Sequence, residues 1–205
     1  KSASYVEMRD EYSQLNEIEH DVNRDPAFDY LSQNFKDDQE WNWNANKSNE
    51  FIEKIKEKGF EKLFLLNLRP MWSKYNKSNL SIDKLHKIIN ENVIEVLEKL
   101  PKNIAVVSVP FNTDHYGFSD MEPALDIKDL CDDKGIENYF VFSRELHARD
   151  KIKFLKNFDF GLCMRFHACI FLKSLNIPVF GLDYTAGELG KVGGLFESFK
   201  DKNYC

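Results

Sequence analysis

The stretch from residue 158 to residue 191, which reads FDFGLCMRFHACIFLKSLNIPVFGLDYTAGELGK, is the most informative part of the sequence for the fold of this chain. It contains two apolar runs, residues 158–163 and 177–182, which have the length and composition of buried strands. A helical pattern at residues 168–175 lies between them. A strand, a helix and a second strand are therefore expected, and the two strands should be parallel because a helix joins them.

The rest of the chain repeats this alternation of apolar runs and helical patterns. Strands are expected at residues 63–68, 104–109 and 139–142, and helices at residues 48–58, 81–100, 121–134, 145–157 and 192–199. Ser81 and Ser143 stand where helix N-caps are expected, and Gly59 and Gly135 stand where helices end. Short strands joined by helices indicate right-handed parallel crossovers. The predicted fold is therefore α/β, a doubly wound, Rossmann-like parallel sheet.

The amino-terminal part differs in pattern from the rest. A strand is expected at residues 5–8 and a helix at residues 9–18, whereas residues 32–47 are rich in Asn, Gln, Asp and Trp and indicate a linker or an exposed binding loop. Because the chain starts at Lys1 in the middle of a pattern, we expect it to be part of a longer protein. The predicted division is residues 1–40, the end of a preceding half and a linker, and residues 41–205, one Rossmann-like domain.

Composition excludes several classes of protein. The chain has 205 residues, 42% of them hydrophobic, which is enough for a packed core. Its net charge is −6 with Lys and Glu interspersed, so no basic face for nucleic acid is expected. The four cysteines lack the spacing of metal ligands and indicate buried thiols in a reducing compartment. No signal peptide or membrane-spanning run is present in the sequence, which favours a cytoplasmic location.

Basic side chains follow the carboxyl ends of several predicted strands. Arg69 follows the first strand of the domain, Arg165 and His167 follow a later one, and Lys191 lies in the predicted loop after the last. Ligands bind at this edge of open α/β sheets, and arginine and lysine bind phosphate and carboxylate groups. The joint placement favours an anion site, while four unrelated surface cations are the alternative.

His167 allows two interpretations. At the start of a helix its ring can face the cleft and act as a proton donor or as a hydrogen-bond donor to an anion; alternatively, it is a buried histidine bonded to a backbone carbonyl. His115, next to Asp114, is ambiguous in the same way. No pair of histidines has zinc-site spacing, so no metal is expected.

Other polar and aromatic residues are weaker candidates. Ser143, Thr185 and Gly187 could place hydroxyl and N–H groups on phosphate oxygens, but no glycine-rich phosphate loop is present. Trp41, Trp43 and Trp72 lie in polar segments and could stack on a sugar or a base.

These motifs resemble the polysaccharide pyruvyl transferase family. The similar elements are Asn67-Leu68-Arg69, Val109-Pro110-Phe111, GLCMRFHA at 161–168, IPVFGLDY at 177–184 and the later Lys191. MRDEYS at 8–13 and DPAF at 25–28 are similar to the segment that joins the two halves of the family's members. The resemblance spans nearly the whole chain. Two departures are Phe166 in place of a leucine, and the longer distance from Tyr184 to Lys191.

The resemblance implies a fold, a reaction and a set of site residues. The chain would be the carboxyl-terminal, donor-binding half of a two-domain enzyme similar to GT-B glycosyltransferases. Such an enzyme moves a pyruvyl group from phosphoenolpyruvate to a sugar and forms a ketal. His167 and Arg165 would be catalytic, with His167 as the acid. The substrate-binding residues would be Arg69, Asn67, Asn112, Ser143, Tyr184, Thr185 and Lys191.

The resemblance also implies partners. Phosphoenolpyruvate would be a co-substrate with no further cofactor, and the acceptor would be a cell-surface saccharide or its lipid-linked or nucleotide-linked precursor. A homo-oligomer and a location at the inner face of the membrane are compatible with this reaction. Two other functions remain open at this point. One is a GT-B glycosyltransferase that uses a nucleotide sugar, and the other is a non-catalytic saccharide-binding module.

Overall fold

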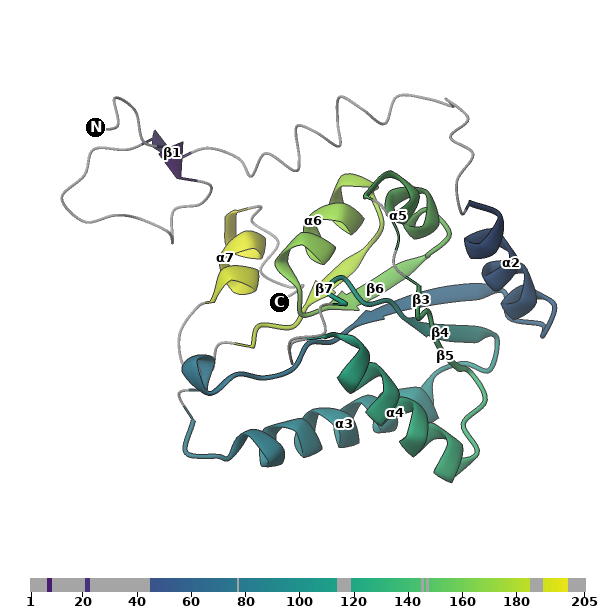
Figure 1. Ribbon diagram of the computed structural model, residues 1–205, viewed down its shortest axis with the longest axis horizontal. Coiled ribbons are helices and arrows are strands. Elements are labelled where there is room, and N and C mark those ends of the chain that lie inside the picture. Colours follow the sequence, from purple (N-terminus) through teal and green to yellow (C-terminus); the bar gives the residue numbers. More distant parts are fainter. Residues whose placement is uncertain are drawn as a thin grey trace.

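The computed structural model describes residues 7–8, 21–22, 45–76, 78–113, 119–144, 146, 148–184 and 190–198. Its main feature is a five-stranded sheet in which every described pairing is parallel (Figure 1). The strands are Lys62–Asn67 (β3), Ile104–Ser108 (β4), Tyr139–Val141 (β5), Phe160–Cys163 (β6) and Val179–Gly181 (β7). Their order across the sheet is β5-β4-β3-β6-β7, and the Rossmann-like prediction is confirmed.

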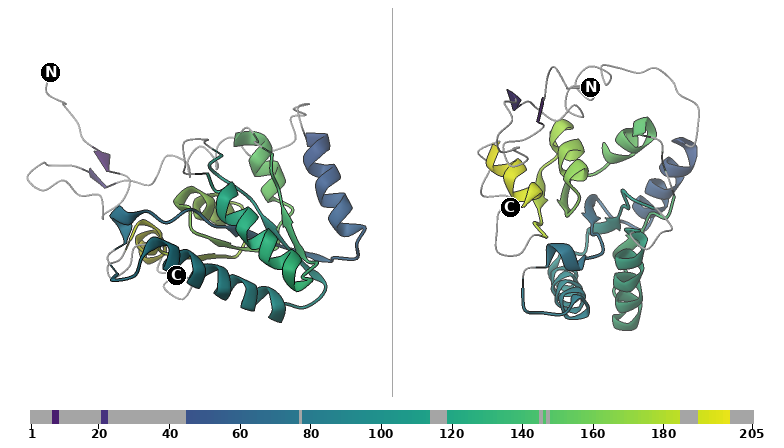
Figure 2. Two further views of the ribbon diagram at one scale, coloured as in Figure 1. Left: turned by 60° about the horizontal axis from the view of Figure 1, so that its bottom comes forward. Right: turned by 60° about the vertical axis from the view of Figure 1, so that its left-hand side comes forward.

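Helices cover both faces of this sheet. On one face lie α3 (Ile82–Lys99) and α4 (Met121–Lys134); on the other lie α2 (Ala45–Lys56), α5 (Ala148–Leu155), α6 (Phe166–Ser174) and α7 (Lys191–Ser198). The first view of Figure 2 brings α3 and α4 to the front, and the second shows the two helical layers on opposite sides of the sheet. The chain is therefore a three-layer α/β/α domain over its described part.

The order of the strands explains the two helical layers. The chain proceeds from β3 through β4 to β5 in one direction across the sheet, and then from β6 to β7 in the opposite direction. Because parallel crossovers are right-handed, a reversal of direction moves the connecting helices to the other face. The reversal lies between β3 and β6, which are hydrogen-bonded neighbours. A crevice for ligands is expected at the carboxyl ends of these two strands.

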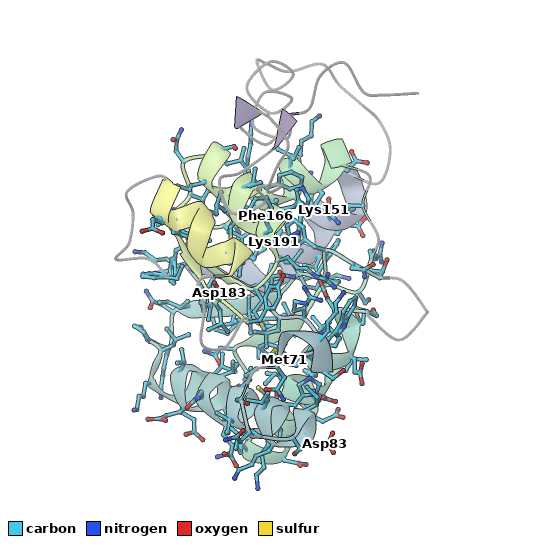
Figure 3. The ribbon with its side chains drawn as sticks, turned by 90° about the vertical axis from the view of Figure 1, so that its left-hand side faces the viewer. Met71, Asp83, Lys151, Phe166, Asp183 and Lys191 are labelled. Atoms are coloured by element: carbon cyan, nitrogen blue, oxygen red, sulfur yellow. The ribbon has the colours of Figure 1, made fainter. Side chains whose placement is uncertain are left out.

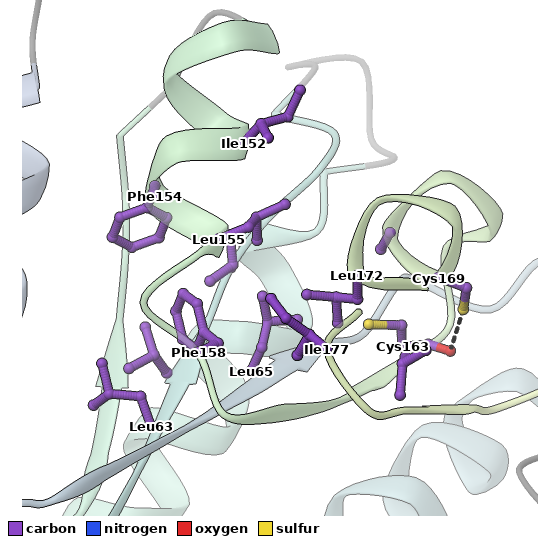
Figure 4. Packing of buried hydrophobic residues seen from close by; sticks show 14 of the residues in the cluster. Leu63, Leu65, Ile152, Phe154, Leu155, Phe158, Cys163, Cys169, Leu172 and Ile177 are labelled. Carbon is purple, nitrogen blue, oxygen red and sulfur yellow. Dashed lines mark hydrogen bonds between the residues drawn. The ribbon is translucent and has the colours of Figure 1, made fainter. Parts of the chain in front are cut away.

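Each strand contributes alternate side chains to two cores. Leu63 and Leu65 of β3 pack toward α5 and α6, whereas Phe64 and Leu66 pack toward α3 and α4. Figure 4 shows the first core, in which Leu65 lies close to side chains of the segments around β6 and α6. Burial on both faces explains why the strands appear in the sequence as continuous apolar runs.

Several predicted helix ends are confirmed. The helix at residues 121–134 is α4, and the side chain of Ser81 accepts a hydrogen bond from Lys84 N–H at the start of α3. Gly59 and Gly135 have φ angles of 92° and 68°, in the left-handed region that glycine adopts without strain.

Four other boundaries differ from the predictions. Helix α6 begins at Phe166, two residues earlier than predicted, and α2 begins at Ala45, inside the predicted linker. Ser143 does not cap α5, because that helix begins only at Ala148. Lys191 is the first residue of α7 and not part of a loop. The predicted helix at 9–18 lies outside the described residues.

The amino-terminal part contributes a separate pair of short parallel strands, Glu7–Met8 (β1) and Asp21–Val22 (β2). The strand predicted at residues 5–8 contains β1, whereas β2 was not expected. The division near residue 40 stays a prediction. Among the described helices, none combines the length and the apolar character that are needed to cross a membrane.

We predict that the domain loses stability above about pH 9, because three buried acids keep their protons in the fold. Burial raises the pKa of the Cys131 thiol from 9.0 to about 11, and burial also raises the pKa values of the Cys163 thiol and the Tyr139 hydroxyl. In the unfolded chain these groups lose their protons earlier. The unfolded state therefore binds fewer protons, and the free energy of unfolding falls as pH rises.

Urea unfolding under reducing conditions, from about pH 7 to about pH 10, measures this effect. The midpoint should fall along this series, and more gently in Cys131→Ala, which lacks one of the three acids. A wild-type midpoint that stays level above about pH 9 would contradict the prediction.

Candidate functional site

Asn67 joins the carboxyl ends of three strands. It is the last residue of β3 and its side chain is fully buried, at 0% exposure. Its Oδ1 accepts a hydrogen bond from the backbone N–H of Arg165 at 3.1 Å, and its Nδ2 donates to the carbonyl oxygen of Val109 at 3.0 Å and to Asp120 Oδ2 at 3.2 Å. Arg165 follows β6 and Val109 follows β4, so this amide connects both sides of the switch point between β3 and β6.

Asp120 holds the guanidinium group of Arg165. Its Oδ1 accepts from Arg165 Nε at 2.9 Å and from Nη2 at 2.6 Å, and its Oδ2 accepts from the N–H groups of Phe111 at 3.0 Å and Asn112 at 3.1 Å. The Asp120 side chain is 1% exposed and that of Arg165 is 20% exposed. The arginine is thus fixed against a buried carboxylate at the carboxyl edge of the sheet. Asp120 belongs to no motif in the sequence, and it was not predicted as a site residue.

Arg165 also occupies the N-cap position of α6, but its side chain does not cap the helix. The first-turn N–H groups of a helix have no carbonyl partners within it, and the first turn of α6 contains no acidic residue. Since α6 begins directly after β6, these N–H groups lie at the carboxyl edge of the sheet. This arrangement favours an anion there.

His167 is the second residue of α6 and its side chain is exposed. Its ring lies edge-on to Phe166, with 5.6 Å between the ring centroids. The interpretation of His167 as a buried core histidine is therefore wrong. Its role as a proton donor stays a prediction.

Arg69 lies in an aromatic environment just beyond β3. Its side chain is buried, at 8% exposure, and its guanidinium carbon is 4.4 Å from the centroid of the Tyr184 ring and 5.1 Å from that of the Trp72 ring. Lys74 Nζ lies 4.3 Å from the Trp72 centroid. The predicted residues Arg69 and Tyr184, from the segments after β3 and β7, are thus brought together. These cation–π contacts hold the Arg69 guanidinium at the carboxyl edge of the sheet.

The side chain of Asp183, which precedes α7 in the chain, lies at the start of that helix. Its Oδ2 accepts hydrogen bonds from the N–H groups of Gly190 at 2.7 Å and Gly193 at 3.0 Å. The carboxylate of Asp183 therefore lies at the end of this helix that favours a negative charge. Lys191 is exposed at the first position of the same helix. Figure 3 faces the carboxyl edge of the sheet and labels Asp183 and Lys191 there, with Phe166 of α6 and Met71 of the segment after β3.

The remaining predicted residues have different positions. Ser143 is exposed after β5, which is two strands away from β3, and no described contact joins it to the arginines. The N–H of Asn112 donates to Asp120 Oδ2, and the N–H of Asp120 donates to the carbonyl oxygen of Asn112. Thr185, Gly187, Asp114 and His115 lie outside the described residues, as do Trp41 and Trp43. Within the described part of the chain, no three His, Cys, Asp or Glu side chains form a group that could hold a metal ion.

Replacing Asp183 by alanine should destabilise the domain by about 1 kcal/mol, the usual cost of a lost helix cap. Asp183→Asn is the matched control, because an amide oxygen can still accept from Gly190 and Gly193 N–H, and it should cost less. Urea unfolding of the two variants beside the wild type measures the difference. Equal stability of Asp183→Ala and the wild type would show that the carboxylate does not stabilise α7.

The fold and this edge define a Rossmann-like α/β domain in which two arginines and the start of a helix lie at the switch point of the sheet. The sequence profile of the polysaccharide pyruvyl transferase family matches residues 2–185. The chain belongs to this family.

Comparison with other proteins adds no functional assignment. No curated protein matches the chain. A Listeria monocytogenes structure described as a UDP-N-acetylglucosamine 2-epimerase is similar with a TM-score of 0.43 and 16% identity, over 88% of this chain and 46% of that one. The N-terminal domain of Candida albicans trehalose-6-phosphate phosphatase gives a TM-score of 0.38 and 11% identity, over 86% and 39%. The chain thus spans less than half of either protein, and its place in a GT-B-like pair of domains stays a prediction.

Proposed function

We propose that this chain is the donor-binding half of a transferase that moves a pyruvyl group from phosphoenolpyruvate to a sugar and forms a ketal. Membership in the pyruvyl transferase family supports the reaction class. The observation that carries the choice of donor is the position of Arg165, which is held at the switch point and at the first turn of α6. Small anions are the ligands that such a position favours.

The charges at this edge suit a donor with two acidic groups. Phosphoenolpyruvate carries a carboxylate and a phosphate. The guanidinium groups of Arg69 and Arg165 bring two positive charges and Asp120 one negative charge. Asp183 and Lys191 at the start of α7 bring one charge of each sign, so these five groups leave one net positive charge before the helix start of α6 is considered. Arginine donates hydrogen bonds in a planar fork that matches both acidic groups. Asn67 is buried and engaged with Arg165 and Asp120, which supports an indirect role for it in donor binding.

The proposed reaction assigns a proton transfer to His167. Its imidazolium donates a proton to the methylene carbon of the donor, while a sugar hydroxyl oxygen attacks the adjacent carbon that bears the phosphate. A second hydroxyl of the same sugar then displaces the phosphate and closes the ketal ring. Two C–O bonds and one C–H bond form, while the C–O bond to phosphate, the π bond of the C=C double bond and the two hydroxyl O–H bonds break. Of the two hydroxyl protons, one balances the proton given to the methyl group and one leaves with the phosphate.

The family's description supports a polysaccharide or its precursor as the acceptor. A lipid-linked or nucleotide-linked saccharide and a cytoplasmic setting, with no cofactor beyond the donor, are parts of the same proposal. Acceptor contacts would come mainly from the other half of the enzyme. The exposed position of His167 supports access of a sugar hydroxyl to the reacting carbon.

Calorimetric titration of the 205-residue chain with phosphoenolpyruvate tests the choice of donor. Binding is expected, and it should be competed by inorganic phosphate. UDP-sugars and GDP-sugars are the comparison ligands, because a glycosyltransferase domain would prefer them. Saturable binding of a nucleotide sugar without binding of phosphoenolpyruvate would overturn the proposal. With the complete protein, formation of a ketal on candidate glycans tests the reaction itself.

A further inference from the structure

We infer that Asp120 is a positioning residue, which sets the direction in which Arg165 presents its guanidinium group to the anionic donor. This inference rests on the proposed function for its donor, phosphoenolpyruvate. Asp120 lies on the segment between β4 and α4, 45 residues before Arg165 in the sequence. Nothing in the motif around Arg165 indicates it.

The Asp120 carboxylate is itself held in place. The N–H groups of Phe111 and Asn112 and the amide of Asn67 all donate to its Oδ2, and its side chain is 1% exposed. A buried carboxylate with several fixed donors cannot rotate freely, so its Oδ1 points in one direction. The Nε and Nη2 atoms of Arg165 both donate to this oxygen, which fixes the plane of the guanidinium group.

Asn67 completes the arrangement by holding the other end of Arg165. Its Oδ1 accepts from the backbone N–H of Arg165, while its Nδ2 donates to Asp120. The backbone and the side-chain end of Arg165 are therefore both fixed by one connected set of hydrogen bonds. A side chain that is ordered before the ligand arrives loses less conformational entropy on binding, so this set should increase affinity for the donor.

The direction in which removal of the Asp120 carboxylate changes the affinity for phosphoenolpyruvate distinguishes positioning of Arg165 from simple electrostatics. Asp120 brings a negative charge to the site, so by charge alone its removal should strengthen the binding of an anion. If Asp120 acts by orienting Arg165, its removal should weaken binding instead. Asp120→Asn has nearly the same shape and removes the charge, so it distinguishes the two effects.

The test is a double-mutant cycle of Asp120→Asn and Arg165→Lys, with calorimetric titration of phosphoenolpyruvate into the 205-residue chain. Asp120→Asn should weaken binding roughly tenfold in the wild-type background, which is the size of one lost hydrogen bond to a charged group. In the Arg165→Lys background the same change should not weaken binding, because lysine has no planar fork to orient. An unchanged or tighter affinity of the single variant, or equal weakening in both backgrounds, would overturn the inference.

A second measurement does not require phosphoenolpyruvate. In the free wild-type chain, the NMR signal of Arg165 Nε–H should be protected from solvent exchange, since it donates to a buried carboxylate. Asp120→Asn should lose this protection, and Asp120→Glu, which keeps the charge but moves it, should lose part of it. Protection that persists in both variants would refute positioning by Asp120. If the wild type shows this protection but does not bind phosphoenolpyruvate, the proposed donor is wrong while the positioning role of Asp120 stands.

Discussion

Arg165→Ala should abolish detectable binding of phosphoenolpyruvate and also lower the free energy of unfolding by about 2–3 kcal/mol. The second effect arises because the change leaves the buried Asp120 carboxylate without its charged partner. We place the cost below the usual range of about 3–5 kcal/mol because Arg165 is 20% exposed and because three N–H groups still donate to Asp120. Urea unfolding and calorimetric titration measure the two effects on the same samples.

Two variants control this experiment. Arg144→Ala removes an exposed arginine that follows β5, farther from the switch point, and it should change neither stability nor binding. Arg165→Met combined with Asp120→Asn removes both charges, so it should recover part of the lost stability without recovering binding. Retained binding in Arg165→Ala would exclude Arg165 from the donor site.

His167→Gln should lower kcat in the complete protein on the order of 10²- to 10⁴-fold, the usual contribution of a general acid, while phosphoenolpyruvate affinity changes little. Glutamine keeps a hydrogen-bond donor at this position but cannot transfer a proton at neutral pH. His167 is exposed in the first turn of α6, so the change should leave the stability of the domain nearly unaltered. Rates of ketal formation and donor titrations measure the two properties separately.

His167→Ala is the matched comparison. It should lose kcat to the same extent, and it should lose some donor affinity if the imidazole also donates a hydrogen bond to the bound anion. Should His167→Gln turn over at the wild-type rate, another group must protonate the methylene carbon, and the assigned role of His167 would be wrong.

The sequence was sufficient to predict the parts of the fold that depend on local pattern. Buried strands of a doubly wound sheet appear as continuous apolar runs, and the helices between them are marked by Ser81, Gly59 and Gly135. Arg165 could be predicted as a candidate site residue because it follows an apolar run closely, and the carboxyl ends of strands in such sheets lie at the edge where ligands bind. The order of the strands could not be read in the same way, since it depends on pairing between distant segments.

The residues that complete the site are joined by contacts between distant parts of the chain. Asn67 and Arg165 are 98 residues apart, and Asp120 lies in a polar segment that resembles any loop. Asp183 was also missed, although its partners Gly190 and Gly193 are only 7 and 10 residues further along the chain. A carboxylate that lies outside the helix gives no capping pattern at the start of that helix. Side chains whose role is fixed by tertiary hydrogen bonds leave no periodic signal in the sequence.

The errors at helix starts have a local cause. Helix α6 was expected to begin at Ala168 because Phe166 and His167 follow a strand and give no capping signal. The actual N-cap is Arg165, an uncommon residue at this position, and its side chain is directed to Asp120 and not to the first turn. Similarly, α7 was expected to begin after Lys191, because the carboxylate at its start comes from Asp183, outside the helix.

In the proposed function, the carboxyl edge between β3 and β6 binds the anionic donor. A crystal structure of the chain with phosphoenolpyruvate tests it most directly. Electron density for the donor is expected against the guanidinium group of Arg165 and the first turn of α6. Density for a bound donor on another face, with this edge empty, would contradict it.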